Sequence, residues 1–425
     1  MNTLSATGFA QIIYGVVAGI TLLRGGLIVR QMRYVWRHRQ HIPAAFSEQI
    51  SAVQHFRAAE YTVAKNRLAL FQLALEWVVF LGATWLGGVA ALSSWWARHL
   101  TGVLGQGVAL IASVLLIITL LELPLDLYRK FILEQRFGFN TTSIAAFFKD
   151  MLLQTALGAA LGLPLLGAVL WVMLKMGGLW WWYAWLLWVT FNLFLLMIYP
   201  VWIAPLFNRF TPLSEGELKQ SLQKLLKQCD FAAEGLYVMD GSRRSRHGNA
   251  FFTGFGRNRR IVLFDTLIQH LQTVEIEAVL AHELGHFYHK HVLGRMISIF
   301  ALSLALLWGL AQAMHQPALF AGLHVNMSSA GMALSLLIVA LPVLALPVQV
   351  LMSLASRRQE FEADAYAAGA VEAEHLISAL VHLYRDNATS LTSDPWYSLF
   401  FDSHPNAQQR VAHLLALAHE QPVTE

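Results

Sequence analysis

Seven apolar stretches constrain what this chain of 425 residues can fold into. The longer ones contain the roughly 20 consecutive apolar residues that a helix needs to cross the hydrocarbon core of a bilayer. They lie at residues 8–23, 68–96, 103–128, 151–174, 179–207, 297–314 and 331–355. No Lys or Arg precedes the first stretch, so we interpret it as a retained span and not as a signal peptide. The sequence therefore predicts an all-α multi-pass membrane protein with seven transmembrane helices.

Positive charges gather on one side of the predicted membrane. The connections after spans one, three, five and seven carry most of the loop Lys and Arg, whereas the other connections hold only Arg98 and Lys175. Loops retained in the cytoplasm carry the excess of positive charge. We therefore expect the amino terminus outside and the segment after span five in the cytoplasm. This topology also accounts for the net charge of +4, so we expect no nucleic-acid partner.

Residues 281–286 carry the chemistry of the chain, with the sequence Ala-His-Glu-Leu-Gly-His. In a helix, His282 and His286 lie on one face and can reach a single metal ion. Zinc in catalytic sites takes three protein ligands and a water, and Glu283 is placed to accept a proton from that water. The pattern predicts zinc-dependent hydrolysis of peptide bonds. The alternative is a helix whose two histidines only cap a charged face.

A third zinc ligand has to come from elsewhere in the chain. The single Cys229 excludes a cysteine-rich zinc site and an intramolecular disulfide. The best candidate is Glu360, in the charged stretch that follows span seven. Glu362 competes with it, because sequence spacing alone does not separate the two.

A small sheet is expected before the histidine motif. Residues 236–239 and 260–264 have the composition of strands, and residues 249–253 lie between them. Zinc peptidases commonly hold the substrate backbone by adding it to an edge strand, so Asn249, Ala250 and Phe251 are candidate substrate-binding residues. An ordinary hairpin is an equally good interpretation of the same residues.

These features divide the chain into four regions. Residues 1–207 form a membrane region of five spans that includes a polar helical hairpin at residues 24–67. We expect residues 208–296 to form a cytoplasmic-side, zincin-like α+β catalytic region. Spans six and seven occupy residues 297–356, and a helical region at residues 357–425 completes the zinc site.

Several motifs together resemble a known family, the membrane-embedded CAAX prenyl endopeptidases and their bacterial relatives. These enzymes are zinc metalloproteases best known for trimming prenylated protein tails. The likeness covers most of the chain. The motifs are residues 281–286 with His291, residues 356–364, residues 249–251, and residues 394–398 with 403–405, and residues 37–65 and 203–208 add family character.

The resemblance implies roles for particular residues. Glu360 is the third ligand of one zinc ion per chain, and Asp364 accepts a hydrogen bond that orients a ligand histidine. His404 is the downstream active-site histidine, and Arg410 approaches the zinc-bound carboxylates. The family's seven tilted spans enclose a large water-filled chamber, which we expect here too.

The resemblance also sets expectations about substrate and location. The expected partners are membrane lipids and a peptide or protein tail that carries a lipid in some cases. The chain ends without the dilysine-type tail of eukaryotic members. We therefore expect a bacterial-type member in a bacterial inner membrane, with its active site facing the cytoplasm.

Two other functions fit parts of the sequence. A heat-shock-type quality-control protease shares the histidine and glutamate motifs, but such proteases have fewer spans. A transporter or scaffold with a structural zinc site requires four closed ligands, whereas Glu283 stands beside an expected open position.

Overall fold

Seven long apolar helices dominate the fold, which confirms the predicted number of spans. The structure is a computed structural model that describes residues 5–253, 259–325 and 329–420. The helices that carry the seven spans are α1 (Ala6–His38), α2 (Ala52–Ala83), α4 (Val103–Leu127), α5 (Ile144–Lys175), α6 (Trp180–Ile198), α11 (His291–Met314) and α13 (Ala330–Ala370). α4 continues into a π-helical segment at Tyr128–Glu134, and α6 is followed by another at Tyr199–Ile203 and by α7 (Ala204–Phe207).

The first two spans differ from the expectation in length. α1 has 33 residues, which at 1.5 Å per residue is about 50 Å, more than a bilayer core requires. The polar segment at residues 24–67 consists of the facing ends of α1 and α2 with their connection, so it continues the two spans.

The predicted end of the span at residues 68–96 was wrong. α2 stops at Ala83, and the chain turns through Gly87, which has a φ of +71°, into α3 (Gly88–His99). A Cβ at Gly88 would stand 2.6 Å from the carbonyl oxygen of Gly82, so the turn requires glycine.

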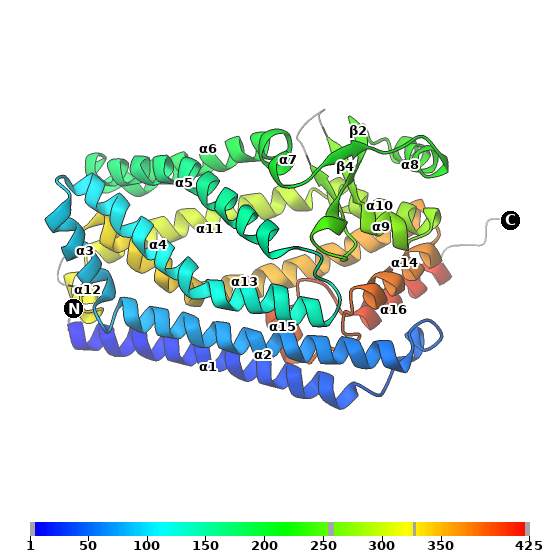
Figure 1. Cartoon of the computed structure of the whole chain (residues 1–425), viewed down its shortest axis with the longest axis horizontal. Coiled ribbons are helices and arrows are strands. Elements are labelled where there is room, and N and C mark those ends of the chain that lie inside the picture. The colour runs from blue at the N-terminus through cyan, green and yellow to red at the C-terminus, as the bar shows by residue number, and fades with distance from the viewer. Residues whose placement is uncertain (1–4, 254–258, 326–328, 421–425) are drawn as a thin grey trace.

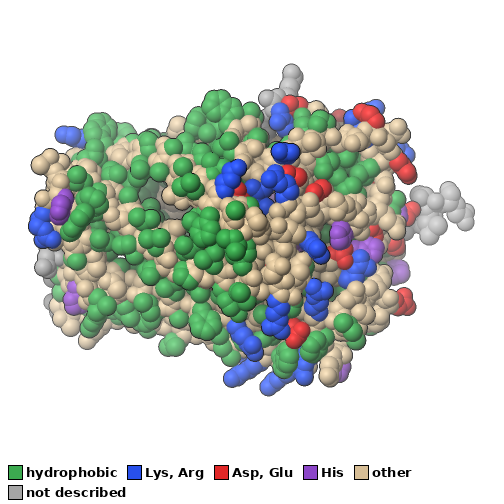
Figure 2. Space-filling model, in the orientation of Figure 1, with side chains coloured by type: hydrophobic (Ala, Val, Ile, Leu, Met, Phe, Trp, Pro, Cys, Tyr) green, Lys and Arg blue, Asp and Glu red, His purple; other side chains and the backbone are tan. Residues whose placement is uncertain are grey.

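The spans lie side by side along the long axis of the molecule, and the remaining elements collect mainly at one end (Figure 1). α3 and α12 (Pro317–Gly322) lie at the left of the view, whereas the sheet, α8 (Glu217–Gln228), α9 (Asp265–His270) and the last helices lie at the right. On the face shown in Figure 2, charged side chains gather over the right half and hydrophobic ones cover the left. The molecule therefore has a membrane part and a polar part.

A four-stranded sheet lies in the polar part, with the order β1-β2-β4-β3. The strands are β1 (Phe210–Pro212), β2 (Gly235–Met239), β3 (Ala250–Thr253) and β4 (Arg260–Phe264). β2 and β4 are parallel, and the other two pairings are antiparallel. The three predicted strands are present, and β3 lies at an edge of the sheet.

The helix α10 (Thr273–Tyr288) packs against both β3 and the last membrane helix, α13. Its start is fixed by a capping box between Gln272 and Glu275. Its buried side chains Ile276, Leu280 and Leu284 belong to the same core as those of β4 and of α14 (Ala373–Asp386). The chain then continues through α15 (Pro395–Phe401) and α16 (Ala407–Glu420), which pack against α13.

Candidate active site

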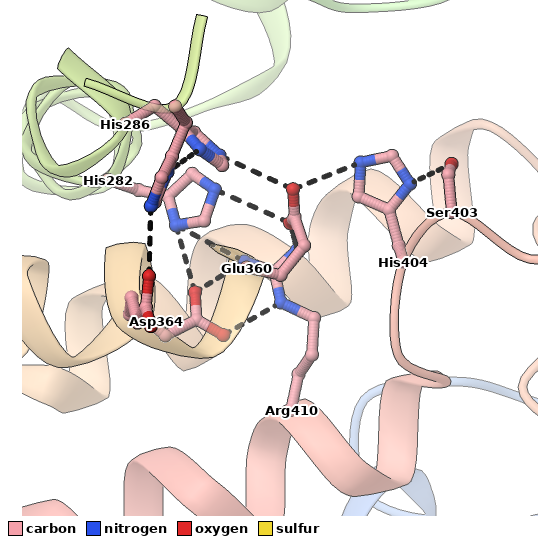
Figure 3. Close-up of polar contacts among 9 residues, drawn as sticks. His282, His286, Glu360, Asp364, Ser403, His404 and Arg410 are labelled. Carbon is pink, nitrogen blue, oxygen red and sulfur yellow. Dashed lines mark hydrogen bonds and ion pairs between the residues drawn. The ribbon is translucent and has the colours of Figure 1, made fainter. Parts of the chain in front are cut away.

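Two helices bring three side chains with metal-ligand atoms together (Figure 3). α10 supplies His282 and His286, and α13 supplies Glu360. Nε2 of His286 lies 3.3 Å from Oε1 of Glu360, and Nε2 of His282 lies 3.6 Å from Oε2 of the same carboxylate. One ligand atom from each residue lies within 4.8 Å of the others. The described residues therefore contain one compact group of candidate ligands.

This group fits a zinc ion in its spacing and in its chemistry. Ligand atoms about 2.1 Å from zinc in a tetrahedral arrangement stand about 3.4 Å apart, close to the separations found here. Oε2 of Glu360 is a buried atom that accepts no hydrogen bond from the described residues. Burying such an oxygen without a hydrogen bond costs free energy, and a bound cation would offset that cost. Two imidazoles and one carboxylate also form a known catalytic zinc set with an open fourth position.

Glu283 lies beside the ligand group, on the wall of a cavity of about 540 Å³. His286, Glu360 and His404 line the same cavity. Burial raises the pKa of the Glu283 carboxyl above its ordinary value. A carboxylate with a raised pKa is a better proton acceptor near neutral pH. Glu283 therefore has the position and the basicity that a general base requires.

Asp364 and Arg410 fix the position of His282 through the ring nitrogen that points away from Glu360. Nδ1 of His282 lies 2.9 Å from Oδ1 of Asp364, which leaves Nε2 free to face Glu360. Arg410, on α16, donates through Nε to Oδ2 of Asp364 at 2.9 Å, and its Nη1 lies 3.4 Å from Oε2 of Glu360. Burial opposes the charge on Arg410, but its hydrogen bond to Asp364 holds its pKa above the usual value. The guanidinium therefore stays charged and links two carboxylates of α13.

His404 lies on the other side of Glu360 (Figure 3). Its Nε2 is 3.5 Å from Oε1 of Glu360, and its Nδ1 is 2.9 Å from Oγ of Ser403. Although 62% of the His404 side chain is exposed, partial loss of its hydration beside the site lowers its pKa, which favours the neutral imidazole. When Ser403 donates to Nδ1, the single ring proton lies on Nε2 and points toward the ligand group.

Arg357 holds the segment that carries His404. Its Nη1 donates to the carbonyl oxygens of Ser398 and Asp402 at 2.6 Å and 2.7 Å. Ser398 lies in α15 and Asp402 directly follows it. Arg357, on α13, therefore fixes the chain just before His404.

Glu362, the competing ligand candidate, lies outside the ligand group. Two residues along a helix correspond to a rotation of about 200°, so Glu362 projects from another face of α13 than Glu360 does. Its Oε2 is 3.0 Å from Nε2 of His291, and its Oε1 accepts from Nε of Arg358 at 3.0 Å.

The candidate substrate-binding residues lie on or next to β3. The backbone of Asn249 accepts a hydrogen bond from Phe264, and Ala250 and Phe251 pair with β4. Phe251 lines a small pocket of about 80 Å³ with Tyr199. In the described chain, these candidate residues do not line the two cavities that contain His404. Their role stays a prediction.

Comparison with known proteins identifies the family. The model for the CAAX prenyl protease N-terminal region with five membrane helices matches residues 31–209, and the model for peptidase family M48 matches residues 212–418. The CAAX prenyl protease 1 homolog of Arabidopsis thaliana is 38% identical over 295 residues, which cover 68% of this chain and 69% of the relative. The chain belongs to the CAAX prenyl proteases of family M48.

Other members of the family agree with this assignment. The CAAX prenyl protease 1 of Saccharomyces cerevisiae is 33% identical over 333 residues, with 74% of this chain and 73% of the relative covered. The crystal structure of S. mikatae Ste24p has a TM-score of 0.87 at 28% identity and covers 97% of this chain and 100% of its own. This member of the family is therefore an integral-membrane zinc metalloendopeptidase, and the resemblance predicted from its motifs is confirmed.

Some site residues were given no role in the sequence analysis. Ser403 and Arg357 lie within the motifs that carried the resemblance, yet their contacts depend on how α13 meets the chain after α15. Tyr384 also lines the cavity that reaches Arg410. No sequence pattern signals it, because its position depends on how α14 packs against α16.

Proposed function

We propose that His282, His286 and Glu360 bind one zinc ion per chain and that Glu283 acts as the general base in peptide-bond hydrolysis. The observation that carries this proposal is the group of ligand atoms within 4.8 Å of one another, with Glu283 on the wall of the adjoining cavity. Zinc bound to such a set polarises the substrate carbonyl and lowers the pKa of a water molecule. Glu283 takes the proton from the attacking water and delivers it to the leaving amine.

His404 stabilises the charge that develops during the reaction. Negative charge grows on the carbonyl oxygen as water attacks, and a donor already in place for it lowers the barrier. Nε2 of His404 faces the ligand group at 3.5 Å from Glu360 and can supply that donor. Arg410 contributes by holding Glu360 and Asp364 in place.

The cavities around the site suit an extended peptide. A second cavity of about 660 Å³, lined by residues of α2 and α14, also reaches His404. His404 and Ser403 line both cavities, so a peptide can extend from one into the other past the ligand group. The relatives are named as CAAX prenyl proteases, and a CAAX sequence is a carboxyl-terminal motif whose cysteine carries a prenyl group. We infer that the substrates are peptides or protein tails, lipidated in some cases, taken up beside membrane lipids.

The orientation follows from the positive charges. The Lys and Arg of the connections lie mostly at the end of the molecule that holds α10, which we place in the cytoplasm. The expected bacterial inner membrane stays a prediction, because the relatives described above come from eukaryotes.

The test is the Glu283→Gln variant. Glutamine keeps the size of the side chain but does not take up the proton, so we expect normal zinc content and at least a 100-fold loss of the maximal rate, on the order of one acid–base group. Zinc is measured by metal analysis and cleavage by mass spectrometry of a peptide panel. Wild-type turnover by this variant contradicts the proposal.

The same variant serves to identify the substrate. In cells it should hold uncleaved tails, which co-purify and are sequenced by mass spectrometry. Matched peptides with and without a farnesyl group then show whether the lipid lowers KM. Equal KM values for the two peptides contradict recognition of the lipid and leave the peptidase proposal intact.

Neither alternative function is favoured. The match to a family model with five membrane helices before the catalytic region opposes a heat-shock-type protease with fewer spans. A purely structural zinc site is opposed by Glu283, which lies on the cavity wall beside the three candidate ligands that the described residues provide.

A further inference from the structure

His282 has a carboxylate against its Nδ1, whereas the described part of the chain places another histidine against Nδ1 of His286. Nδ1 of His286 lies 2.9 Å from Nδ1 of His291, and Nε2 of His291 lies 3.0 Å from Oε2 of Glu362. Nε of Arg358 donates to the other oxygen of Glu362 at 3.0 Å. We call His286, His291 and Glu362 the histidine series. It leads from the ligand group to a second carboxylate of α13.

The turn between α10 and α11 brings His291 into this series. α10 ends at Tyr288, and Lys290 adopts a φ of +57°, in the left-handed region that residues other than glycine rarely occupy. This turn starts α11 at His291 and directs its ring toward His286, where it is 6% exposed. An unfavourable backbone conformation beside an active site commonly serves the placement of a functional side chain.

The contacts of the series specify where its protons lie. Nε2 of His286 faces Glu360, so in the zinc-bound form Nδ1 carries the proton and donates it to Nδ1 of His291. A neutral His291 that accepts at Nδ1 carries its own proton on Nε2. That proton is donated to the carboxylate of Glu362. One arrangement of protons therefore satisfies every contact in the series.

We propose that His291 and Glu362 are positioning residues that orient His286 for zinc, as Asp364 does for His282. This inference rests on the proposed zinc site. A group that accepts the second N–H of a ligand histidine fixes the ring and raises its basicity. The Asp364 side chain is 0% exposed, whereas Glu362 is 36% exposed. Water screens the charge of Glu362, so its contribution is the smaller of the two.

The test is zinc affinity, measured on the purified full-length protein by competition with a chromophoric chelator. We expect His291→Ala to weaken binding by about 10- to 100-fold and Glu362→Ala by about 10-fold, the range for groups behind a ligand histidine. Glu362→Gln should lie between Glu362→Ala and the wild type, because its amide oxygen still accepts the hydrogen bond. Glu374→Ala, at an exposed glutamate of α14, is the matched control and should bind as the wild type does. Wild-type affinity in both alanine variants of the series overturns the proposal.

A double variant separates positioning from general damage to the fold. If Glu362 acts through His291, the variant with both alanines binds zinc no more weakly than His291→Ala alone. If the affinity losses of the two single variants multiply in the double variant, Glu362 does not act through His291, and the proposal is overturned. Loading with cobalt gives a second readout, because a reoriented His286 shifts the visible absorption bands. A variant that is merely less stable keeps the wild-type spectrum once loaded, and such a spectrum for His291→Ala also overturns the proposal.

The failure of this inference is distinguishable from failure of the zinc site itself. Equal zinc binding by the wild type and Glu360→Ala refutes the site. Loss of zinc by Glu360→Ala together with wild-type affinity in His291→Ala refutes only the positioning role.

Discussion

The carboxylate of Glu360 lies at the centre of four nitrogen-bearing side chains. Its Oε1 faces His286 at 3.3 Å and His404 at 3.5 Å, whereas its Oε2 faces Arg410 at 3.4 Å and His282 at 3.6 Å. Two of these partners are candidate ligands, one is a candidate donor to the substrate, and one is a fixed positive charge. We therefore expect removal of this single side chain to affect zinc binding, catalysis and charge balance together.

Zinc content distinguishes the carboxylates of α13. We expect Glu360→Ala to lose most bound zinc, because two imidazoles alone make an incomplete site. Glu362→Ala should keep full stoichiometry at saturating zinc, and Asp364→Ala should weaken affinity by about 10- to 100-fold. Metal analysis after purification at several zinc concentrations checks all three. Equal zinc content in the three variants rules out this assignment of ligands.

His404 is expected to act on the rate and not on zinc. His404→Ala should keep bound metal and KM but lower the maximal rate by about 100-fold or more, the effect of losing one donor to the carbonyl oxygen. Steady-state kinetics on the zinc-loaded protein measure this. His419→Ala, at an exposed histidine of α16, is the control. An unchanged maximal rate in His404→Ala would make His404 an ordinary surface residue.

Side chains close in sequence were predictable, and those that meet through packing were less so. His282, Glu283 and His286 follow from helical spacing alone, since they share a turn and a half. The choice between Glu360 and Glu362 depends on the rotation of α13 about its axis, which spacing does not specify. Only the resemblance to a family favoured Glu360 over Glu362 at the level of sequence.

At the scale of elements, the contact between α10 and α13 sets the distance between the ligands. A Cβ at Gly285 would stand 2.9 Å from Cα of Ala363 and 3.0 Å from its carbonyl oxygen. Both are backbone atoms, so no side-chain rotation relieves the contact. Gly285, between His282 and His286, is therefore what allows the two helices to approach so closely.

Gly285→Ala tests this contact. The added methyl group should push α10 and α13 apart, destabilise the protein by about 1–3 kcal/mol as overpacking does, and lower zinc affinity. Gly294→Ala is the matched control, because a Cβ at this helical glycine of α11 meets nothing within 4 Å. Thermal unfolding and chelator competition measure the two effects. A Gly285→Ala protein with the melting temperature and zinc affinity of Gly294→Ala contradicts the role of this contact.

Hydropathy predicted the spans better than their ends. All seven apolar stretches appear as helices, because each must satisfy its backbone groups internally within a bilayer. It did not show that α2 stops at Ala83, since α3 is apolar as well. Nor did it show that α1 continues to His38, because helical structure extends past the membrane core wherever a partner such as α2 packs against it.

At the scale of the whole molecule, the ligand group lies where the membrane part meets the polar part. α13 spans both, with an apolar start and the carboxylates Glu360 and Asp364 near its end. α11 begins directly after the turn that follows α10. This position agrees with the proposal that the substrate is a peptide or protein tail, lipidated in some cases.

Labelling of single cysteines tests the orientation. In a Cys229→Ser background, Lys290→Cys should react with a membrane-impermeant maleimide only from the cytoplasmic side, because the positive charges place α10 there. Lys175→Cys, at the exposed opposite end of α5, is the control and should react only from the other side. Labelling of residue 290 from the non-cytoplasmic side reverses the topology.

The order of the site residues along the chain has a consequence for synthesis. His282 and His286 precede spans six and seven, Glu360 follows them, and Arg410 lies on the last helix. A ribosome has to translate at least through residue 410 before every member of the set has been made. We therefore expect a nascent chain that stops before Glu360 to lack a zinc ligand, so that peptide hydrolysis begins only after spans six and seven have been made.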